Sequence, residues 1–191
     1  YSWARMAHHY ASGKSGSFFL PEIGDEVVFG FLDNDPCHPI ILGSLFNGKN
    51  DPPYYPATAN NIKAFVTRSK MKLEFDEEKK SIRLLTPGNN LIVISDDEKY
   101  IELKDQHHNS LTLNADGISM NSSGDIKISA MGNIQTEAAG NIKATATNDL
   151  ALQGLTVNVN AQTQLIAKGM ASAEFSAAGE TTLKGAIVMI N

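Results

Sequence analysis

An eight-residue repeat in the last third of the chain limits its fold more than any other feature. Successive units begin at Gly124, Gly132, Gly140 and Asn148, and each has an apolar residue two positions later. A period of eight is too short for the helical hairpins or propeller blades of longer repeat proteins. It fits one short strand followed by one tight turn. A single strand of this kind cannot bury its apolar side, so the repeat must stack on something.

The composition changes sharply along the 191 residues. All seven prolines lie at or before Pro87, the single Trp and all Tyr, His and Arg residues precede position 109, and Phe175 is the only aromatic residue after Gly124. This shift predicts a globular head at residues 1–50, a linker at 51–61 and a long shaft at 62–191. We expect the regular octads to begin at about residue 118.

The head has the pattern of a small β-barrel. Alternating apolar residues predict a strand at 27–31, a turn at Asp33–Pro36 and a second strand at 39–47, which together make a hairpin. Gly13–Gly16 is interpreted as a flexible loop and Phe18–Pro21 as a short strand that ends at proline.

The first half of the shaft shows alternating strands separated by turn residues such as Thr86–Asn90. The expected strands are Ala64–Thr67, Met71–Phe75, Ser81–Leu85, Asn90–Ile94, Tyr100–Leu103, Ser110–Leu113 and Gly117–Met120. Their spacing shortens from about ten residues to about eight toward the C-terminus, which predicts a shaft that becomes more regular.

In the octads, apolar residues keep one parity up to Gly154 and the other parity after it. A strand that changes parity must turn its apolar side over or absorb the change in a bulge, and Gly154 is suited to such a register break. The predicted shaft core comprises Ile126, Ile128, Ile134, Ile142, Leu150, Leu152, Val157, Val159, Leu165, Phe175 and Leu183.

One apolar stripe per strand supplies too little interior for a β-helix made by one chain. Three chains could each supply one wall of a triangular prism, with their inward Ile, Leu and Val side chains meeting on the axis. The small Ala, Thr and Gly residues of the tail suit a narrow axis. We therefore expect an all-β protein that consists of a small barrel and a homotrimeric triangular β-helix.

Four motifs in order resemble one family: Trp3–Ala7, Pro21–Val27, Phe31–Pro36 and Pro39–Asn47. They are similar to the oligonucleotide/oligosaccharide-binding (OB) barrel of VgrG proteins, the spikes of type VI secretion systems, which are related to central spikes of contractile phages. Asn34 stands where the family usually has Gly, and Asn tolerates the positive φ of such a turn. The resemblance implies a C-terminal fragment that lacks the upstream domains and the first barrel strand, and an intertwined homotrimeric shaft.

The resemblance also implies function and partners. It implies a structural, membrane-puncturing spike that is assembled on a baseplate in the bacterial cytoplasm and then secreted or injected into a target cell. Expected partners are tube and baseplate proteins, secreted effectors, the target membrane in transient contact, and a tip protein of the PAAR type. The apolar end that would dock this tip consists of Ala186, Ile187, Val188, Met189, Ile190 and Asn191.

The charge and the polar clusters argue against other classes. A net charge of −5 with few basic residues in the head argues against a nucleic-acid partner. His8–His9 and His107–His108 are adjacent pairs that point to opposite sides of a strand, so no metal site within one chain is expected, and an ion on a trimer axis remains open. Asp33, Asp35 and Asp96–Glu98 lack calcium-loop spacing.

No catalytic constellation is apparent, and Cys37 beside His38 has no sign of an organised triad. The expected protein is therefore not an enzyme and has no cofactor. Two alternatives fit the sequence less well. One is a trimeric tail-fibre or adhesin stalk that binds a surface ligand, which the barrel motifs disfavour, and the other is a polysaccharide-cleaving β-helix, which the coil length disfavours.

Overall fold

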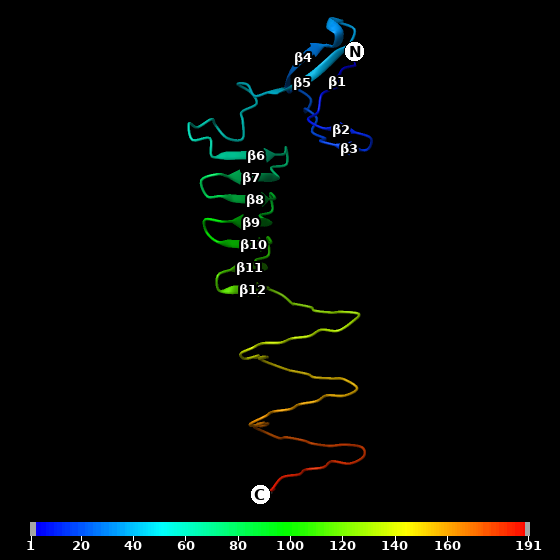
Figure 1. Cartoon of the computed structure of the whole chain (residues 1–191), viewed down its shortest axis with the longest axis vertical. Helices are drawn as coiled ribbons and strands as arrows, with labels where there is room; N and C mark the ends of the chain where they lie inside the picture. Colours follow the sequence, from blue (N-terminus) through cyan, green and yellow to red (C-terminus); the bar gives the residue numbers. More distant parts are fainter. Residues whose placement is uncertain (1–2, 190–191) are drawn as a thin grey trace. The chain divides into compact units, whose positions relative to one another are not determined.

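The computed structural model describes residues 3–189, which divide into two compact units, Tyr1–Ser129 and Ala130–Asn191. The first unit contains every strand of the described chain (Figure 1). These strands are β1 (Arg5–Met6), β2 (Ala11–Ser12), β3 (Ser15–Gly16), β4 (Glu26–Phe31), β5 (Pro39–Leu45), β6 (Ile62–Val66), β7 (Lys72–Asp76), β8 (Ser81–Leu85), β9 (Leu91–Ser95), β10 (Tyr100–Lys104), β11 (Ser110–Asn114) and β12 (Gly117–Asn121).

The head is built around the predicted hairpin. β4 and β5 pair antiparallel, with a register shift between Val28 and Phe29, and β1 pairs parallel to β5. A single 3-10 turn, Leu32–Asn34, joins β4 to the loop before β5, and Asp33 and Asn34 both have left-handed φ values of 52° and 57°. The Asn at position 34 thus adopts the positive φ expected of it.

Two expectations for the head are wrong. The segment Gly13–Gly16 is not a flexible loop, because β2 and β3 form a tight hairpin through Gly13 and Lys14, and Lys14 has a φ of 59°. The segment Phe18–Pro21 is not a strand; no backbone partner lies beside it. Phe18 and Phe19 instead remain exposed.

The expected strands of the upper shaft are confirmed within one or two residues. β6 to β12 form one antiparallel sheet in sequence order, so each strand pairs with the next (Figure 1). Each of these seven strands has five residues. Each connecting turn carries one residue of positive φ: Lys70, Lys80, Asn89, Lys99, His108 and Gly117. Turns of this kind reverse the chain within a few residues and keep neighbouring strands in register.

The chain by itself has almost no hydrophobic core. Within residues 3–189, Val93 is the only hydrophobic residue that is buried, at 4% exposure. Folded domains normally gain most of their stability from apolar burial. The strands of one copy are therefore paired through their backbones, but hardly any of their apolar side chains are buried.

The octad segment lies mostly in the second unit and has no strand of its own. Residues 122–189 make no backbone-to-backbone hydrogen bond within the chain, and every residue of 123–189 is exposed. Figure 1 shows this segment as extended passes joined by sharp reversals. Extended backbone leaves its N–H and C=O groups free to pair with another strand.

Among the described residues, no helix has the length and apolar character that a membrane crossing requires.

Candidate functional site

Two rows of apolar side chains lie on one face of the sheet, one across all seven strands and one across the six strands from β7 to β12, since Lys63 takes the β6 position of the second row. The strand register places the members of each row directly opposite one another on successive strands. The first row is Phe65, Leu73, Leu84, Ile92, Leu103, Leu111 and Met120, and the second is Phe75, Ile82, Ile94, Ile101, Leu113 and Ile118. We call this surface the apolar face.

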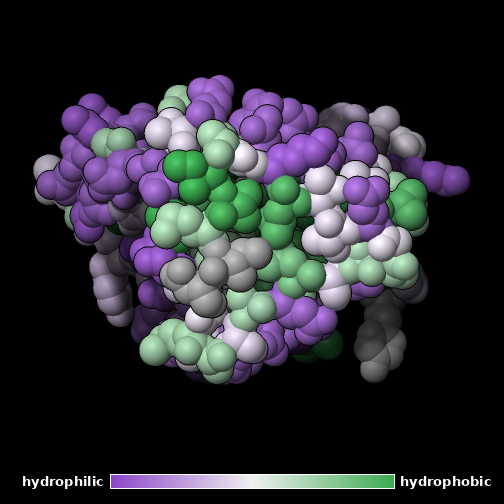
Figure 2. Space-filling view, turned by 90° about the horizontal axis from the view of Figure 1, so that it is seen from below, coloured by the Kyte–Doolittle hydropathy of each residue, from purple (hydrophilic) through white to green (hydrophobic). Residues whose placement is uncertain are grey.

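The apolar face is open to solvent. Ile92, in the central strand, is 39% exposed, and Ile118, in the last strand, is 76% exposed. Part of the first row lines a groove of about 690 Å³, together with Phe19 of the head. Figure 2 views the chain from below, at its C-terminal end, and shows apolar side chains among hydrophilic ones there. A contiguous apolar surface of this kind marks an interaction site.

The opposite face of the sheet is more polar, although it also carries Val93, Leu85 and Leu91, and we call it the polar face. Residues Glu74, Arg83, Val93 and Glu102 follow one another across β7 to β10. The four most buried residues of the sheet, Glu74, Ser81, Val93 and Ser95, also lie on this face. The large apolar side chains of the sheet that are exposed lie on the apolar face.

The head contributes one aromatic residue to the apolar face. The ring of Phe19 stacks on that of Phe65, with 5.7 Å between ring centroids and 19° between ring planes. Phe65 begins the first apolar row in β6. On the rim of the same strand pair, the Arg68 guanidinium donates to the Glu22 carboxylate at 2.9 Å.

A polar cluster occupies the other face at the start of the sheet. The Tyr54 hydroxyl donates to the Glu74 carboxylate, and the Lys72 ammonium donates to the Tyr54 hydroxyl at 2.7 Å and to Glu74 at 3.3 Å. Lys72 also lies 5.2 Å from the centre of the Tyr54 ring. Glu74 is one of the most buried polar residues described, at 9% exposure.

The three groups shift one another's titration. Burial alone would raise the pKa of Glu74, but hydrogen bonds from Tyr54 and Lys72, with the positive charges of Lys72 and Arg83, hold that pKa below its ordinary value. Burial and the hydrogen bond to Glu74 raise the pKa of Tyr54. The hydrogen bond to Tyr54 raises the pKa of Lys72. Around neutral pH the cluster therefore holds a carboxylate, an ammonium and a neutral phenol.

This linkage predicts a loss of stability in acid. Because the pKa of Glu74 is lower in the folded chain, its contribution is present above its ordinary pKa of 4.5 and disappears as the pH falls through the lowered value. We expect Glu74→Gln to lower the urea midpoint at pH 7 but to have little effect near pH 3. Urea unfolding at equal chain concentration measures both differences. Equal losses at the two pH values would contradict the prediction.

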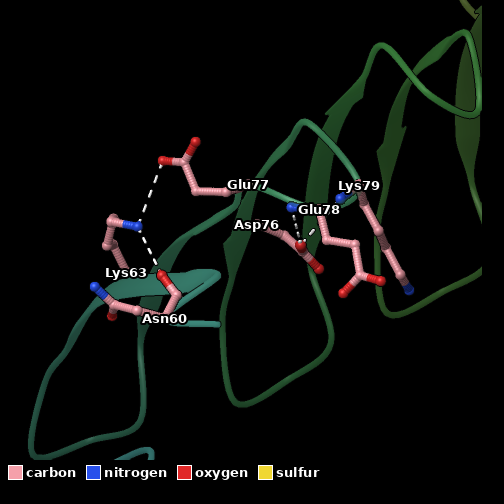
Figure 3. A network of polar contacts seen from close by, with 6 residues as sticks. All are labelled: Asn60, Lys63, Asp76, Glu77, Glu78 and Lys79. Atoms are coloured by element: carbon pink, nitrogen blue, oxygen red, sulfur yellow. Dashed lines mark hydrogen bonds and ion pairs between the residues drawn. The ribbon is translucent and has the colours of Figure 1, made fainter. Parts of the chain in front are cut away.

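A second polar network ties the end of the linker to the turn after β7 (Figure 3). The Lys63 ammonium donates to the Asn60 carbonyl at 2.8 Å and lies 3.7 Å from the Glu77 carboxylate. The Asp76 carboxylate accepts the backbone N–H groups of Glu78 and Lys79 at 3.0 Å each. Such bonds stabilise the turn and leave no open cation site.

The predicted shaft core lies in the octad segment and is fully exposed in one copy. All eleven residues, from Ile126 to Leu183, are between 51% and 76% exposed in this chain. Gly154 lies in extended backbone, where an added Cβ would approach the Thr156 carbonyl oxygen to 3.3 Å. The inward orientation of the core residues and the register break at Gly154 stay predictions.

The predicted docking end is exposed over its described part. Ala186, Ile187, Val188 and Met189 carry no cover, and Ile187 is 81% exposed. Ile190 and Asn191, the last two residues of that prediction, lie outside the described residues. A role for this end in docking remains a prediction.

The remaining candidates are not brought together. Within residues 3–189, no three His, Cys, Asp or Glu side chains are placed to share a metal ion. Asp35 accepts from the Cys37 backbone and lies 3.1 Å from the His38 ring, which holds the turn before β5. Cys37 is exposed.

Sequence reasoning missed two features. The predicted shaft core began at Ile126 and left out the strands before it. The alternation from Phe65 to Met120 already indicated apolar residues on one side of each of those strands. The alternation was recognised strand by strand, and only the register showed that the strands share two rows. Nothing in the sequence indicated that Tyr54, rather than Tyr55, contacts the sheet.

Comparisons with known proteins add the family of the head. Residues 1–46 match the model of the type VI secretion system/phage-baseplate injector OB domain. The chain is 33% identical over 100 residues to the type VI secretion system spike protein VgrG1a of Pseudomonas aeruginosa. The aligned residues make up 52% of this chain and 14% of that protein. It is 41% identical over 58 residues to VgrG1c of the same organism, covering 30% of this chain and 8% of the relative.

A third relative is the actin cross-linking toxin VgrG1 of Vibrio cholerae, 40% identical over 52 residues, or 27% of this chain and 5% of the toxin. The chain thus spans only a small part of the length of these relatives. The matched regions support a structural spike segment.

Proposed function

Because this chain carries the injector OB domain and is related to VgrG spike proteins, we propose that it forms part of a trimeric puncturing spike in a contractile injection machine. The single observation that supports this most is the uncovered apolar face of a sheet in which each strand pairs with the next. We propose that two further copies of the same chain cover this apolar face.

Three copies meet the needs of both shaft segments. Their apolar faces enclose a common interior in the upper shaft, and each buried Leu or Ile contributes about 1.5–3 kcal/mol. In the octad segment, extended passes of one copy lie beside those of the others, which pairs the backbone groups that have no partner within the chain. The small residues around Gly140 suit a narrow axis.

The mechanism is mechanical. A shaft whose strand edges are paired between interlocked copies has to break many hydrogen bonds together before it opens. Resistance of this kind is a slow unfolding rate, and it matters more for a driven spike than the equilibrium stability. No catalytic group is required, and the cross-linking activity in the name of one relative is not carried over to this segment.

The assembly state tests the proposal. A trimer of this 20.6 kDa chain has a mass of about 62 kDa, three times the chain mass. Light scattering coupled to gel filtration at micromolar concentration is expected to give that mass. A folded monomer at that concentration would contradict the proposal, and a dimer would show that two sheets pack face to face instead.

We further propose that the C-terminal end docks a tip protein of the PAAR type. The support is the run of exposed apolar residues from Ile187 to Met189, which three copies would present together. Deletion of residues 186–191 is expected to remove binding to the purified tip protein and to leave the trimer mass unchanged. A pulldown that is the same with and without these residues would argue against docking.

The assembled spike is expected to be built on a baseplate in the bacterial cytoplasm, to contact tube proteins and effectors, and to meet the target membrane only in transit. The alternative is a tail-fibre or adhesin stalk, in which the shaft binds a surface ligand. Binding of the purified trimer to glycans would favour that alternative.

A further inference from the structure

The segment between the head and the sheet is held at both of its ends. On the head side, the Asn47 amide donates to the Glu26 carboxylate at 2.8 Å, and the Asn50 amide donates to Asp25 at 3.3 Å. On the sheet side, the Asn61 amide donates to the Glu78 carboxylate at 3.0 Å. A flexible tether would need none of these contacts.

The middle of the segment is held by Tyr54. Its hydroxyl lies between the Glu74 carboxylate and the Lys72 ammonium, and its ring lies under Lys72. The neighbouring Tyr55 is 75% exposed and makes no recorded side-chain hydrogen bond. Prolines at positions 52, 53 and 56 limit the backbone freedom around Tyr54.

The contacts of Tyr54 and Phe19 lie on opposite faces of the sheet. Glu74 and its neighbour Leu73 point to opposite sides of β7, and Leu73 is paired with Phe65, on which Phe19 stacks. The first two strands are therefore contacted from one side by the linker and from the other by the head.

We propose that Tyr54 is the anchor of a clamp that fixes the joint between the head and the shaft. Because the Tyr54 contact lies on the polar face, it leaves the apolar face free for other copies. Force applied to the head then passes directly into the hydrogen-bonded sheet and does not first stretch the linker. This role in force transfer rests on the proposed spike function, whereas the clamp itself does not.

The test compares Tyr54→Phe with the matched control Tyr55→Phe. Both remove one hydroxyl and keep the ring, but only the first removes the bonds to Glu74 and Lys72. Hydrogen exchange followed by mass spectrometry reports on the Asn60 and Glu77 amides, whose hydrogen bonds to the Ala57 and Asn61 carbonyls hold the end of the linker. We expect Tyr54→Phe to speed their exchange by about 10-fold, as for the loss of one hydrogen bond to a charged group, and Tyr55→Phe to have no effect.

A double-mutant cycle makes the test specific. If Tyr54 acts through Glu74, then Tyr54→Phe in a Glu74→Gln background adds much less than about 10-fold. Additive effects, or equal effects of the two tyrosine variants, would overturn the clamp.

Mass measurement of the same samples separates the two proposals. If the chain is a trimer and Tyr54→Phe does not speed the exchange, only the clamp is overturned. If Tyr54→Phe speeds the exchange but the chain is a folded monomer, only the spike proposal is overturned.

Discussion

Ile118→Asp is expected to prevent assembly. Ile118 lies in β12 at the end of the second apolar row and is 76% exposed in one copy, so the change has little effect on the fold of a single chain. In a trimer, three copies would lose an apolar contact worth about 5–9 kcal/mol in total, and three carboxylates would be brought close together. Light scattering should therefore show the chain mass in place of three times that mass.

The neighbouring residue provides the control. Ser119 is also exposed in β12, but it points to the polar face in line with Thr112. Ser119→Asp adds the same charge to the same strand and should leave the trimer intact. If both variants remain trimeric, the apolar face is not the interface, and if both dissociate, charge rather than burial decides assembly.

Hydrogen exchange of the octad segment is expected to differ strongly between assembled and unassembled chains. The backbone N–H groups of residues 125–189 donate no hydrogen bond within one copy, so they should exchange at nearly the rate of an unfolded chain when the chain is alone. In the trimer they become paired between copies and protected by the stability of the whole assembly. We expect protection of at least about 1,000-fold.

The Ile118→Asp variant supplies the unassembled state for this measurement. The strands β7 to β11 serve as an internal reference, because they are paired within the chain in both states. Unprotected octads in a chain that is trimeric by mass would show that assembly uses the upper sheet alone and that the tail is not intertwined.

The sequence predicted local structure well where side-chain alternation and turn chemistry agree. The strands from Ile62 to Asn121 and the hairpin of β4 and β5 follow from these two signals. It failed at Gly13–Gly16, where a glycine-rich stretch closes a tight hairpin, and at Phe18–Pro21, where two aromatic residues were interpreted as a strand. Composition cannot distinguish these cases, because a flexible loop and a tight hairpin such as Ala11–Gly16 use the same small residues.

The apolar face shows why part of the candidate site needed coordinates. Alternation identifies Leu73 and Ile92 as residues on one side of their own strands, but it does not show that both belong to the same row. Register fixes that relation. A shift of one residue in any strand would send its side chains to the other face.

By itself, the sequence determined that this chain is all-β, that its shaft is built from short alternating strands, and that one copy cannot bury its own apolar residues. These properties follow from periods of two and eight residues, which are local. Only the tertiary structure decided where pairing within the chain ends, at Asn121, and that Tyr54 holds the linker to Glu74. Both depend on contacts between segments that are separated in the sequence, and local patterns of residues do not show which of these segments meet.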